Sequence, residues 1–263
     1  MRKLLKYVEL NLTELCNFNC PFCPRGHGYP NQNLHMSLDT LDLILDNIRD
    51  LDQEITVQLA GRGEPTLHKE FGKILERLLE FREEVPSFRI EMNTNGARVP
   101  RYKHLMDKID RVTYNIYPES RIEYQDAVNT FPDYLVKDKK KPDERKWKTR
   151  AGYIPLTEIN PQSFEPQPRY GKMCHKPFEV VYINYNGDYN LCCDVWKDIE
   201  TLGNVKSEPI SQYYDSNKRL LEYRKNLLKG ERTIDPCKDC NIRCSYEFIQ
   251  RFEEVLSDRK GSH

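Results

Sequence analysis

The chain has 263 residues, of which 38% are hydrophobic and 31% are charged, and its 41 Lys and Arg residues balance 41 Asp and Glu residues. This is enough chain for one large domain or two modest ones with a buried core, and it excludes disorder throughout. No run of about 18 apolar residues marks a membrane span, and the N-terminal segment lacks a secretory signal. Zero net charge removes any general attraction to nucleic acid or anionic membrane. We therefore expect a soluble cytoplasmic protein with neither a membrane nor a nucleic acid as its partner.

The first half of the chain alternates between predicted strands and predicted helices. Strands are expected at 4–12, 54–60, 88–92 and 111–117, and helices at 37–51 (with Ser37 as the N-cap), 68–82 and 101–109. This alternation indicates βαβ units and a parallel sheet. Ligands of such sheets bind at the carboxyl ends of the strands. Distinctive loops beginning near residues 16, 61 and 93 each follow a predicted strand, so we expect them to meet.

The pattern weakens in the second half of the chain. Residues 137–150 carry eight basic and three acidic residues, which we interpret as a solvated surface connection. Residues 178–192 predict a β-hairpin whose tight turn takes its positive φ angles from Asn186 and Gly187. A helix over 220–228 is expected to be capped by Asp215 or Ser216 and closed by Gly230.

Nine cysteines are the most informative feature of the sequence. They fall in tight groups separated by more than a hundred residues, and the chain shows no export signal, so metal thiolate sites are favoured over disulfides. All-thiolate ligation is typical of zinc or of iron–sulfur clusters. The cysteines stand at positions 16, 20, 23, 174, 192, 193, 237, 240 and 244.

The first group, Cys16, Cys20 and Cys23, supplies three thiolates within eight residues. A structural zinc or a closed four-iron cluster needs four protein ligands, whereas three leave one iron open to an exogenous ligand. This C-x3-C-x2-C spacing after the first strand resembles the radical S-adenosylmethionine (SAM) superfamily, and Phe22 fits the aromatic position before its third cysteine. The resemblance implies a [4Fe–4S] cluster with an open site, at which SAM binds.

Two further loops resemble the same superfamily. Residues 61–65, Gly-Arg-Gly-Glu-Pro, are similar to its second-strand Gly-Gly-Glu-Pro motif, with Arg62 as the departure. Residues 93–96, Asn-Thr-Asn-Gly, are similar to its fourth-strand Thr-Asn-Gly signature. The resemblance implies that glycine backbone approaches the methionine end of SAM, that Glu64 or a backbone carbonyl holds its amine, that asparagines reach its ribose or carboxylate, and that an aromatic ring packs on adenine. The expected cofactor-binding residues are Phe22, Gly61, Gly63, Glu64, Pro65, Asn93, Asn95 and Asn115.

The later cysteines resemble the twitch/SPASM auxiliary-cluster domain, over about residues 171–245. The resemblance implies that the hairpin returns Cys192 towards Cys174, and that these two bind one auxiliary [4Fe–4S] cluster together with Cys237 and Cys240. The larger two-cluster SPASM form has an additional C-x5-C-x3-C pattern, where this chain has Cys240-x3-Cys244. We therefore expect the single-cluster, twitch-like form. A zinc ribbon is the alternative for this set.

The implied fold is α/β: a partial (β/α)6-type TIM barrel over residues 1–150, followed over 151–263 by a linker and a small auxiliary-cluster domain that contains a β-hairpin and a helix. Arg150 lies in Thr149-Arg150-Ala151-Gly152, which is similar to an Asn-Arg-x-Gly element before the auxiliary domain of several members. By that resemblance Arg150 grips the SAM carboxylate or a substrate oxygen; the alternative is a surface arginine.

Cys193 and Cys244 exceed the ligands that two clusters need. They are interpreted as buried apolar thiols. The alternatives are ligand exchange at the auxiliary cluster, with Cys244 replacing a neighbour, and donation of a hydrogen atom to a substrate radical. Together with Arg150 they are the expected catalytic residues.

The resemblance implies reductive cleavage of SAM to a 5′-deoxyadenosyl radical, which abstracts a hydrogen atom from a small polar substrate. It also implies a reductant such as flavodoxin or ferredoxin as a partner. A fully thiolate-ligated auxiliary cluster cannot chelate substrate, but it can accept the second electron of an oxidation. This favours a radical SAM oxidoreductase of the dehydrogenase type.

Two other functions stay open. The first is a radical SAM epimerase or peptide-modifying enzyme, for which Cys193 or Cys244 would donate the hydrogen atom. Because the cluster motif begins at residue 16, we expect no room for an N-terminal peptide-recognition domain, which counts against a leader-dependent peptide. The second is a non-enzymatic iron–sulfur or zinc protein, which would not cleave SAM.

Overall fold

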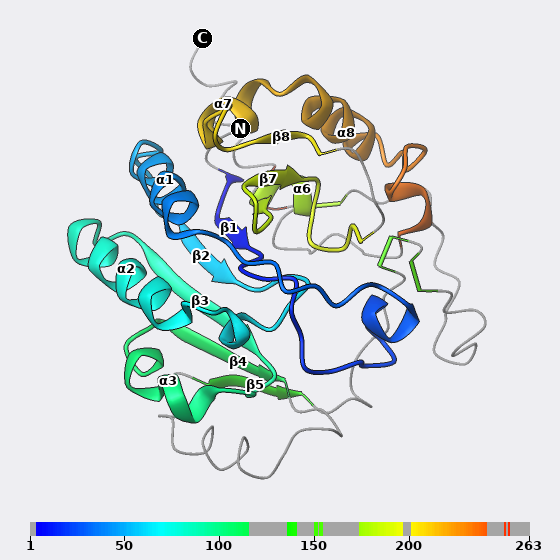
Figure 1. The fold of residues 1–263 in the computed structure, drawn as a ribbon. Helices are drawn as coiled ribbons and strands as arrows, with labels where there is room; N and C mark the ends of the chain where they lie inside the picture. The colour runs from blue at the N-terminus through cyan, green and yellow to red at the C-terminus, as the bar shows by residue number, and fades with distance from the viewer. Residues whose placement is uncertain are drawn as a thin grey trace.

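One mixed β-sheet organises the chain (Figure 1). In a computed structural model, residues 4–115, 136–140, 150–151, 153–154, 174–196, 201–240, 250 and 252 are described. The sheet has the order β5-β4-β3-β2-β1-β6-β7-β8. Its strands are β1 (Tyr7–Leu10), β2 (Thr56–Leu59), β3 (Arg89–Thr94), β4 (Arg111–Asn115), β5 (Val136–Lys140), β6 (Val180–Ile183), β7 (Asp188–Asn190) and β8 (Gly203–Asn204).

Helices connect and flank these strands. They are α1 (Leu38–Arg49), α2 (Phe71–Glu84), α3 (Val99–Met106), α6 (Lys176–Glu179), α7 (Ile210–Ser216) and α8 (Lys218–Leu228), with single 3-10 turns at Pro24–His27, Pro65–Leu67 and Cys237–Asp239. The expected strands and helices of the first half are all present, and Ser37 caps α1 by accepting a hydrogen bond from the Thr40 amide. Among the described residues, none of the helices is long and apolar enough to pass through a membrane.

Strands β1 to β5 run parallel, as expected from the βαβ pattern, and β6 adds a sixth parallel strand. Among the described residues, the sixth parallel strand is β6, which belongs to the C-terminal segment and pairs with β1. The barrel segment and the auxiliary segment therefore share one sheet. Strand order is a long-range property that local periodicity does not carry.

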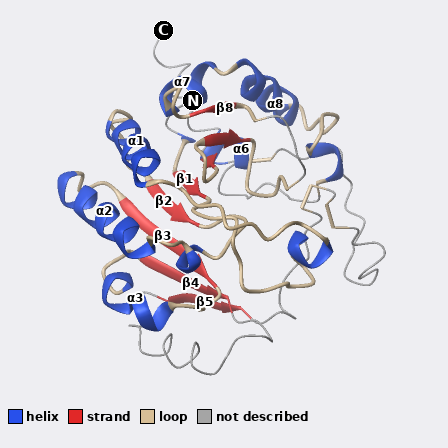
Figure 2. Cartoon of the chain, in the orientation of Figure 1, coloured by secondary structure: helices blue, strands red, loops and turns tan. Residues whose placement is uncertain are grey.

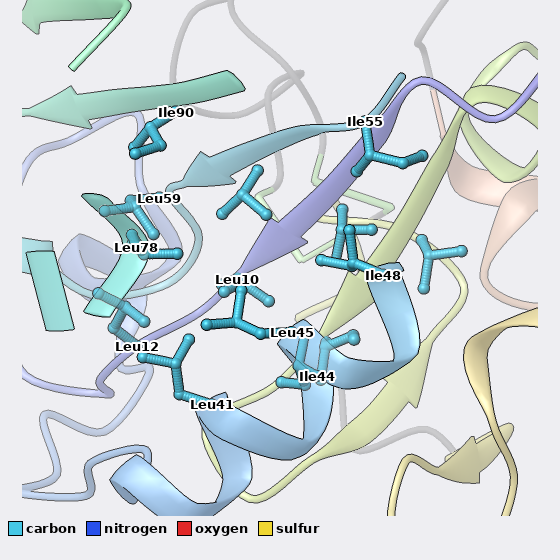
Figure 3. Close-up of a cluster of buried hydrophobic side chains, with 14 of the residues drawn as sticks. Leu10, Leu12, Leu41, Ile44, Leu45, Ile48, Ile55, Leu59, Leu78 and Ile90 are labelled. Carbon is cyan, nitrogen blue, oxygen red and sulfur yellow. The ribbon is translucent and has the colours of Figure 1, made fainter. Parts of the chain in front are cut away.

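The core lies between one face of the sheet and helices α1, α2 and α3, which line the same side of the strands (Figure 2). Apolar side chains of α1, α2 and the strands β1, β2 and β3 form one buried cluster, in which the α1 side chains lie around Leu10 (Figure 3). Each such side chain stabilises the fold by about 1.5–3 kcal/mol through removal of apolar surface from water. Examples are Leu10, Leu41, Ile44, Leu45, Ile48, Leu59 and Ile90.

The opposite face of the same strands is polar. Residues paired across parallel strands point to the same side, and the register places Gln58 and Tyr182 beside Glu9, and Thr113 beside Asn93. We call these residues, together with Glu91 and Asn115, the polar face of the sheet. A polar lining inside a barrel is suited to a ligand rather than to packing.

Two local predictions of the second half differ from the structure. The hairpin turn spans 184–187, with the Gly187 amide bonded to the Asn184 carbonyl, and only Gly187 (φ 91°) is left-handed. This longer turn needs one positive φ, so Asn186 does not supply one. Helix α8 is capped by Asn217 rather than by Asp215 or Ser216, because those two residues end α7, a helix that the sequence pattern did not predict.

The basic run is also partly regular structure. Residues 137–140 lie in β5, the edge strand beside β4, so the interpretation as a surface connection was wrong for this part. Lysine is common on edge strands because its charge discourages pairing with another sheet.

Candidate functional site

The first cysteine loop follows β1, and its shape is fixed by polar contacts. The backbone of Cys16 exchanges two hydrogen bonds with the Asn31 side chain, each of 2.9 Å. The Cys23 amide donates to the Cys20 carbonyl at 3.0 Å. Gly26 packs so closely that a Cβ there would lie 2.5 Å from the Cys20 carbonyl oxygen. The three thiols are therefore presented by one ordered loop.

A buried arginine ties this loop to its surroundings. The Arg25 side chain, 3% exposed, donates to the carbonyls of Glu14 (2.6 Å), Pro30 (2.7 Å) and Arg62 (2.9 Å). It also lies 3.4 Å from the Glu14 carboxylate, which is buried as well. Because Arg62 belongs to the loop after β2, Arg25 joins the first loop to the second.

The glycines of the second loop permit a close approach between backbones. Gly61 has φ 125°, and a Cβ at this position would lie 2.7 Å from the Asn11 Oδ1 atom. A Cβ at Gly63 would lie 2.1 Å from the Thr13 carbonyl oxygen. Any larger residue would push the loop after β2 away from the segment after β1.

Glu64 links the second loop to the third. Its carboxylate, 4% exposed, accepts hydrogen bonds from the hydroxyls of Thr66 (2.7 Å) and Thr94 (2.6 Å) and from the Asn95 amide (2.8 Å). Burial raises the pKa of Glu64, and these hydrogen bonds act in the opposite direction. Pro65 is buried at the start of the turn that follows.

Asn95 closes the ring of three loops. Its side-chain amide donates to Asn17 Oδ1 at 2.9 Å and to the Cys16 sulfur at 4.0 Å. The expectation that these loops meet at the carboxyl ends of strands is confirmed, although the Thr-Asn-Gly motif follows β3 rather than a fourth strand. The other predicted cofactor residues are half-buried nearby: Phe22 in the cysteine loop, Asn93 on β3 and Asn115 on β4.

The second cysteine set lines one cavity, whose empty space is about 370 Å³ with its open, solvent-filled part included. Cys174 precedes α6, Cys192 follows β7, and Cys237 and Cys240 border the last 3-10 turn. All four line the cavity, whose other walls include Leu191, Val195 and Leu227. Among the described residues, no three His, Cys, Asp or Glu side chains form a site for a single metal ion.

These cavity thiols are poorly suited to carrying charge without a metal. Burial raises the pKa of Cys174 to about 11, that of Cys237 to about 12, and that of Cys192 well above its ordinary value. Burial also raises the pKa of Cys16 to about 11. A coordinated thiol is deprotonated because the metal supplies the compensating charge. Four thiols around one cavity fit the four-thiolate donor set of an iron–sulfur cluster.

A group of charged side chains adjoins the cavity at Lys176, which is one of its lining residues. Arg150 donates to Asp194 Oδ1 at 2.7 Å, Lys176 donates to the Cys193 sulfur at 3.5 Å, and that sulfur lies 3.8 Å from Asp194 Oδ2. Glu9, on the polar face, is hydrogen-bonded to Cys193. We call these five residues the Cys193 cluster.

The Cys193 cluster has two buried members, Glu9 and Asp194, and three half-buried ones, and its charges balance. Asp194 is fully buried and Arg150 is 27% exposed. Burial raises the pKa of Glu9, while Lys176 has the opposite influence. The charge of Cys193 is the largest cause of a raised pKa at Lys176. The predicted catalytic residue Cys244 lies outside the described residues. So do Thr149 and Gly152 of the element that contains Arg150.

Sequence reasoning missed Glu9, Lys176 and Asp194. A signal existed for Glu9, because a carboxylate interrupts the apolar β1 segment. Lys176 and Asp194 lie beside predicted cysteine ligands, but nothing in their spacing indicates that they converge.

Arg62 was seen only as a departure from the Gly-Gly-Glu-Pro motif, yet it bridges the two cysteine sites. Its guanidinium donates to the Tyr29 hydroxyl and to the Val195 carbonyl, both at 3.0 Å, and lies 3.5 Å from Glu14 Oε1. Tyr29 packs edge-to-face on Trp196. The first cysteine loop is thus connected to the segment that follows Cys192.

Two family models match the chain on either side of residue 150. Residues 10–130 match the Radical SAM superfamily, and residues 174–241 match SPASM, an iron–sulfur cluster-binding domain. The first match contains all three loops described above. The second contains the four cysteines that line the cavity.

Curated relatives match part of the chain. GTP 3′,8-cyclase from Haemophilus ducreyi is 32% identical over 116 residues, which cover 43% of this chain and 33% of that protein. The Klebsiella pneumoniae enzyme of the same name is 35% identical over 99 residues, which cover 36% and 28%. This chain therefore spans about a third of the length of the curated relatives it matches.

Solved structures resemble nearly the whole chain. BtrN in complex with AdoMet and 2-DOIA has a TM-score of 0.76 and 20% identity, covering 92% of this chain and 95% of BtrN. Streptococcus suis SuiB bound to its precursor peptide SuiA has a TM-score of 0.56 and 12% identity, covering 90% and 70%. At these identities the likeness establishes the fold alone.

Proposed function

This chain carries a radical SAM domain followed by a C-terminal SPASM iron–sulfur domain, and from that premise we propose that it is a radical SAM oxidoreductase that oxidises a small polar molecule. The predicted α/β partial-barrel fold is confirmed by the sheet and by the structural likeness. The predicted cofactor classes, SAM with one cluster and a second auxiliary cluster, are confirmed by the family matches. We place the boundary between the two domains near residue 150, between the matched regions.

The observation that carries the proposal is the cavity lined by Cys174, Cys192, Cys237 and Cys240. Four protein thiols would complete the ligand set of one cluster and leave no position for substrate. A closed cluster can still take an electron from the substrate radical. This supports an oxidation of the substrate over a reaction that leaves its oxidation state unchanged.

When bound, the open cluster with SAM supplies a 5′-deoxyadenosyl radical that takes a hydrogen atom from carbon, and the auxiliary cluster supplies an acceptor for one electron. For a secondary alcohol, loss of that hydrogen atom, one electron and the hydroxyl proton gives a ketone. We assign the proton to Glu9, the buried carboxylate of the polar face. The electron spent in cleaving SAM comes from a reductant such as flavodoxin or ferredoxin.

The chain's own residues orient and protect the reactants. Cys16, Cys20 and Cys23 would hold the open cluster, and Asn95 would orient the first of these ligands. The Glu64 carboxylate is occupied by its bonds to the third loop, so we assign the SAM amine to backbone carbonyls of the second loop. The half-buried Asn93, Asn115 and Phe22 would contact the rest of SAM.

The relatives bear on the substrate only by analogy. BtrN, 2-deoxy-scyllo-inosamine dehydrogenase, resembles this chain over almost its full length and was solved with AdoMet and 2-DOIA. SuiB was solved with a precursor peptide and resembles it less closely. This order supports a small molecule over a peptide.

The test is anaerobic reconstitution, reduction with dithionite in the presence of SAM, and a screen of alcohols and amino alcohols for 5′-deoxyadenosine release. Mass spectrometry of the product decides the reaction type. Loss of two hydrogen atoms from substrate supports the oxidation. Solvent deuterium incorporated at carbon without that loss contradicts it.

The second outcome corresponds to an epimerase or peptide-modifying enzyme, and one observation favours that alternative. Cys193 does not line the auxiliary cavity. It is hydrogen-bonded to Lys176 and to Glu9, which belongs to the polar face. A thiol at that position is placed to donate a hydrogen atom. Cys193→Ser would abolish deuterium incorporation in an epimerase, whereas in an oxidoreductase it would leave product formation measurable.

A further inference from the structure

Arg232 is a buried cation in the wall of the auxiliary cavity. Its side chain is 4% exposed, and it lines the cavity together with Cys174, Cys192, Cys237 and Cys240. Its guanidinium donates to the Cys240 carbonyl at 3.1 Å. Burying a cation costs free energy, which a negatively charged occupant of the cavity would offset.

The end of α8 positions this arginine. The helix is closed by Gly230, which adopts a left-handed conformation with φ 74°. The Glu231 amide donates to the Asn226 carbonyl at 2.9 Å, and the Gly230 amide donates to the Leu227 carbonyl at 3.1 Å. These two bonds form a Schellman motif, in which the chain turns back at the end of the helix. Arg232 thus enters the same cavity wall as Leu227.

The charges of this wall are all of one sign. Besides the four thiols, the ionisable side chains of the described lining are Arg232 and Lys176, and this lining contains no carboxylate. The Lys176 ammonium also interacts with Glu9 and Asp194 of the Cys193 cluster, which oppose its charge. We therefore assign the electrostatic effect on the cavity to Arg232.

The charge of Arg232 acts on the cavity thiols. Burial has the largest influence on the pKa of Cys174 and of Cys237 and raises both, whereas Arg232 acts in the opposite direction. It therefore favours negative charge on these sulfurs. A cluster with four thiolate ligands gains further negative charge when it accepts an electron, and net charge is one of the factors that set its potential. A cation beside it in a medium of low dielectric constant favours the reduced form.

We propose that Arg232 raises the reduction potential of the auxiliary cluster and thereby fits that cluster to accept the electron of the oxidation. This inference rests on the proposed function, in which the substrate radical passes one electron to the auxiliary cluster and loses a proton to give the oxidised product. Arg232 acts on this step through the cluster and is not itself a catalytic residue.

The test is a redox titration of the reconstituted protein, followed by electron paramagnetic resonance, for wild type, Arg232→Gln and Arg232→Lys. The auxiliary cluster is identified as the signal that does not change when SAM is added. At the wild-type midpoint potential, the ratio of reduced to oxidised auxiliary cluster falls at least tenfold in Arg232→Gln, which is about 59 mV for one electron. It changes less than about twofold in Arg232→Lys, because lysine keeps the charge.

Lys238→Gln is the matched control. Lys238 lies between Cys237 and Cys240 in the sequence, but its side chain is 50% exposed and forms an ion pair with Asp235 at 2.9 Å. Because water and salt screen an exposed charge, its removal changes the ratio less than about twofold. A shift in Lys238→Gln as large as that in Arg232→Gln overturns the proposal, because the buried position of Arg232 then has no special effect.

Two further results overturn the proposal. One is an unchanged or higher potential in Arg232→Gln. The other is an equal fall in Arg232→Gln and Arg232→Lys, which would show that the bonds of the guanidinium matter and its charge does not. Iron is counted in each variant. If Arg232→Gln does not retain the second cluster, Arg232→Lys decides: a retained cluster with the wild-type potential supports the proposal, and loss of the cluster there as well overturns it.

The outcomes for Arg232 and for the proposed function are distinguishable. The titration needs no substrate, and dithionite-reduced Arg232→Gln should release 5′-deoxyadenosine as wild type does, because the open cluster is intact. A wild-type protein that cleaves SAM and places solvent deuterium on carbon without oxidation refutes the proposed function, whatever the titration shows. A wild-type protein that oxidises its substrate, but whose Arg232→Gln variant keeps the wild-type potential, refutes only the role of Arg232.

Discussion

The side-chain amide of Asn95 donates to the sulfur of Cys16 at 4.0 Å, while its backbone amide donates to the Glu64 carboxylate at 2.8 Å. One residue of the loop after β3 thus holds the first cysteine of the loop after β1 and is itself held by the loop after β2. Hydrogen bonds to cluster sulfurs are one of the factors that set a cluster's reduction potential.

We therefore expect Asn95→Ala to lower the potential of the open cluster by tens of millivolts, because a donor to a ligand sulfur is removed. The measurement is a redox titration followed by electron paramagnetic resonance. Asn33→Ala is the control, since Asn33 is exposed and bonds only to the His35 ring among the described contacts. An unchanged potential in Asn95→Ala would show that the contact with Cys16 has no electronic effect.

Arg25→Met is expected to destabilise the protein by about 3–5 kcal/mol, because it removes one of the two arginines beside the buried Glu14 carboxylate and the donor to the carbonyls of Glu14, Pro30 and Arg62. Iron bound at the first cysteine loop should fall with it. Arg49→Met removes an exposed ion pair with Glu84 and should cost less than about 1 kcal/mol. Denaturant unfolding measures the free energy of unfolding of both variants. Equal losses would mean that the buried contacts of Arg25 contribute no more to stability than an exposed ion pair does.

The cavity predicts which cysteines hold the auxiliary cluster. Two [4Fe–4S] clusters give about eight irons per chain, and loss of a cavity thiol should reduce this to about four. Alanine at Cys174, Cys192, Cys237 or Cys240 is expected to show that loss after reconstitution. Cys193→Ala is the matched control, because it neighbours Cys192 without lining the cavity, and it should retain about eight. The reverse pattern for Cys192 and Cys193 would reassign the ligand.

His68 predicts a pH dependence of stability. Its Nε2 donates to the Met36 carbonyl (2.8 Å) and its Nδ1 accepts from the Glu70 amide (3.0 Å). Burial lowers its pKa to about 4 from an ordinary value of 6.5. Between these values the unfolded chain binds the extra proton, so stability is complete above 6.5 and falls as the pH drops towards 4.

The measurement is urea unfolding at pH 7 and pH 5 for wild type and His68→Gln. Wild type should lose about 2 kcal/mol more than the variant over this interval, at 1.36 kcal/mol per pKa unit. Subtracting the loss measured in the variant from that of wild type removes the contributions of the other titrating groups. Equal losses in the two proteins would mean that His68 titrates normally in the fold.

Gly63→Ala should weaken SAM binding and destabilise the protein by about 1–3 kcal/mol, because its Cβ would overlap the Thr13 carbonyl. Gly72→Ala is the control. Its Cβ would lie 3.5 Å from the Tyr102 ring, and alanine in a helix is favoured over glycine by up to about 1 kcal/mol. Calorimetry of SAM binding and thermal unfolding distinguish the two. A Gly63→Ala protein that binds SAM normally would show that the close packing is dispensable.

Part of this arrangement is readable from the sequence because its signals are local. Alternating apolar residues define β1 to β4, Ser37 marks the start of α1, and the spacing of Cys16, Cys20 and Cys23 indicates an open cluster. The meeting of the three loops follows from parallel strands alone. Other features depend on contacts between distant segments: β6 beside β1, Lys176 against Cys193, and the bridge made by Arg62.

Competition between equivalent residues accounts for the smaller errors. Asp215, Ser216 and Asn217 are all good helix caps, and only the end of α7 decides in favour of Asn217. Likewise, Asn-Gly is compatible with two turn lengths, and the pairing of Ile183 with Tyr189 selects the longer one.

The most direct test of the account is SAM cleavage by dithionite-reduced protein, measured as 5′-deoxyadenosine, in wild type, Cys16→Ala and Cys237→Ala. If the open iron belongs to the first loop and the cavity holds a closed cluster, wild type and Cys237→Ala release 5′-deoxyadenosine and Cys16→Ala does not. Release of 5′-deoxyadenosine by Cys16→Ala, or no release by wild type, would contradict the assignment of the open cluster to the first loop and of the closed cluster to the cavity.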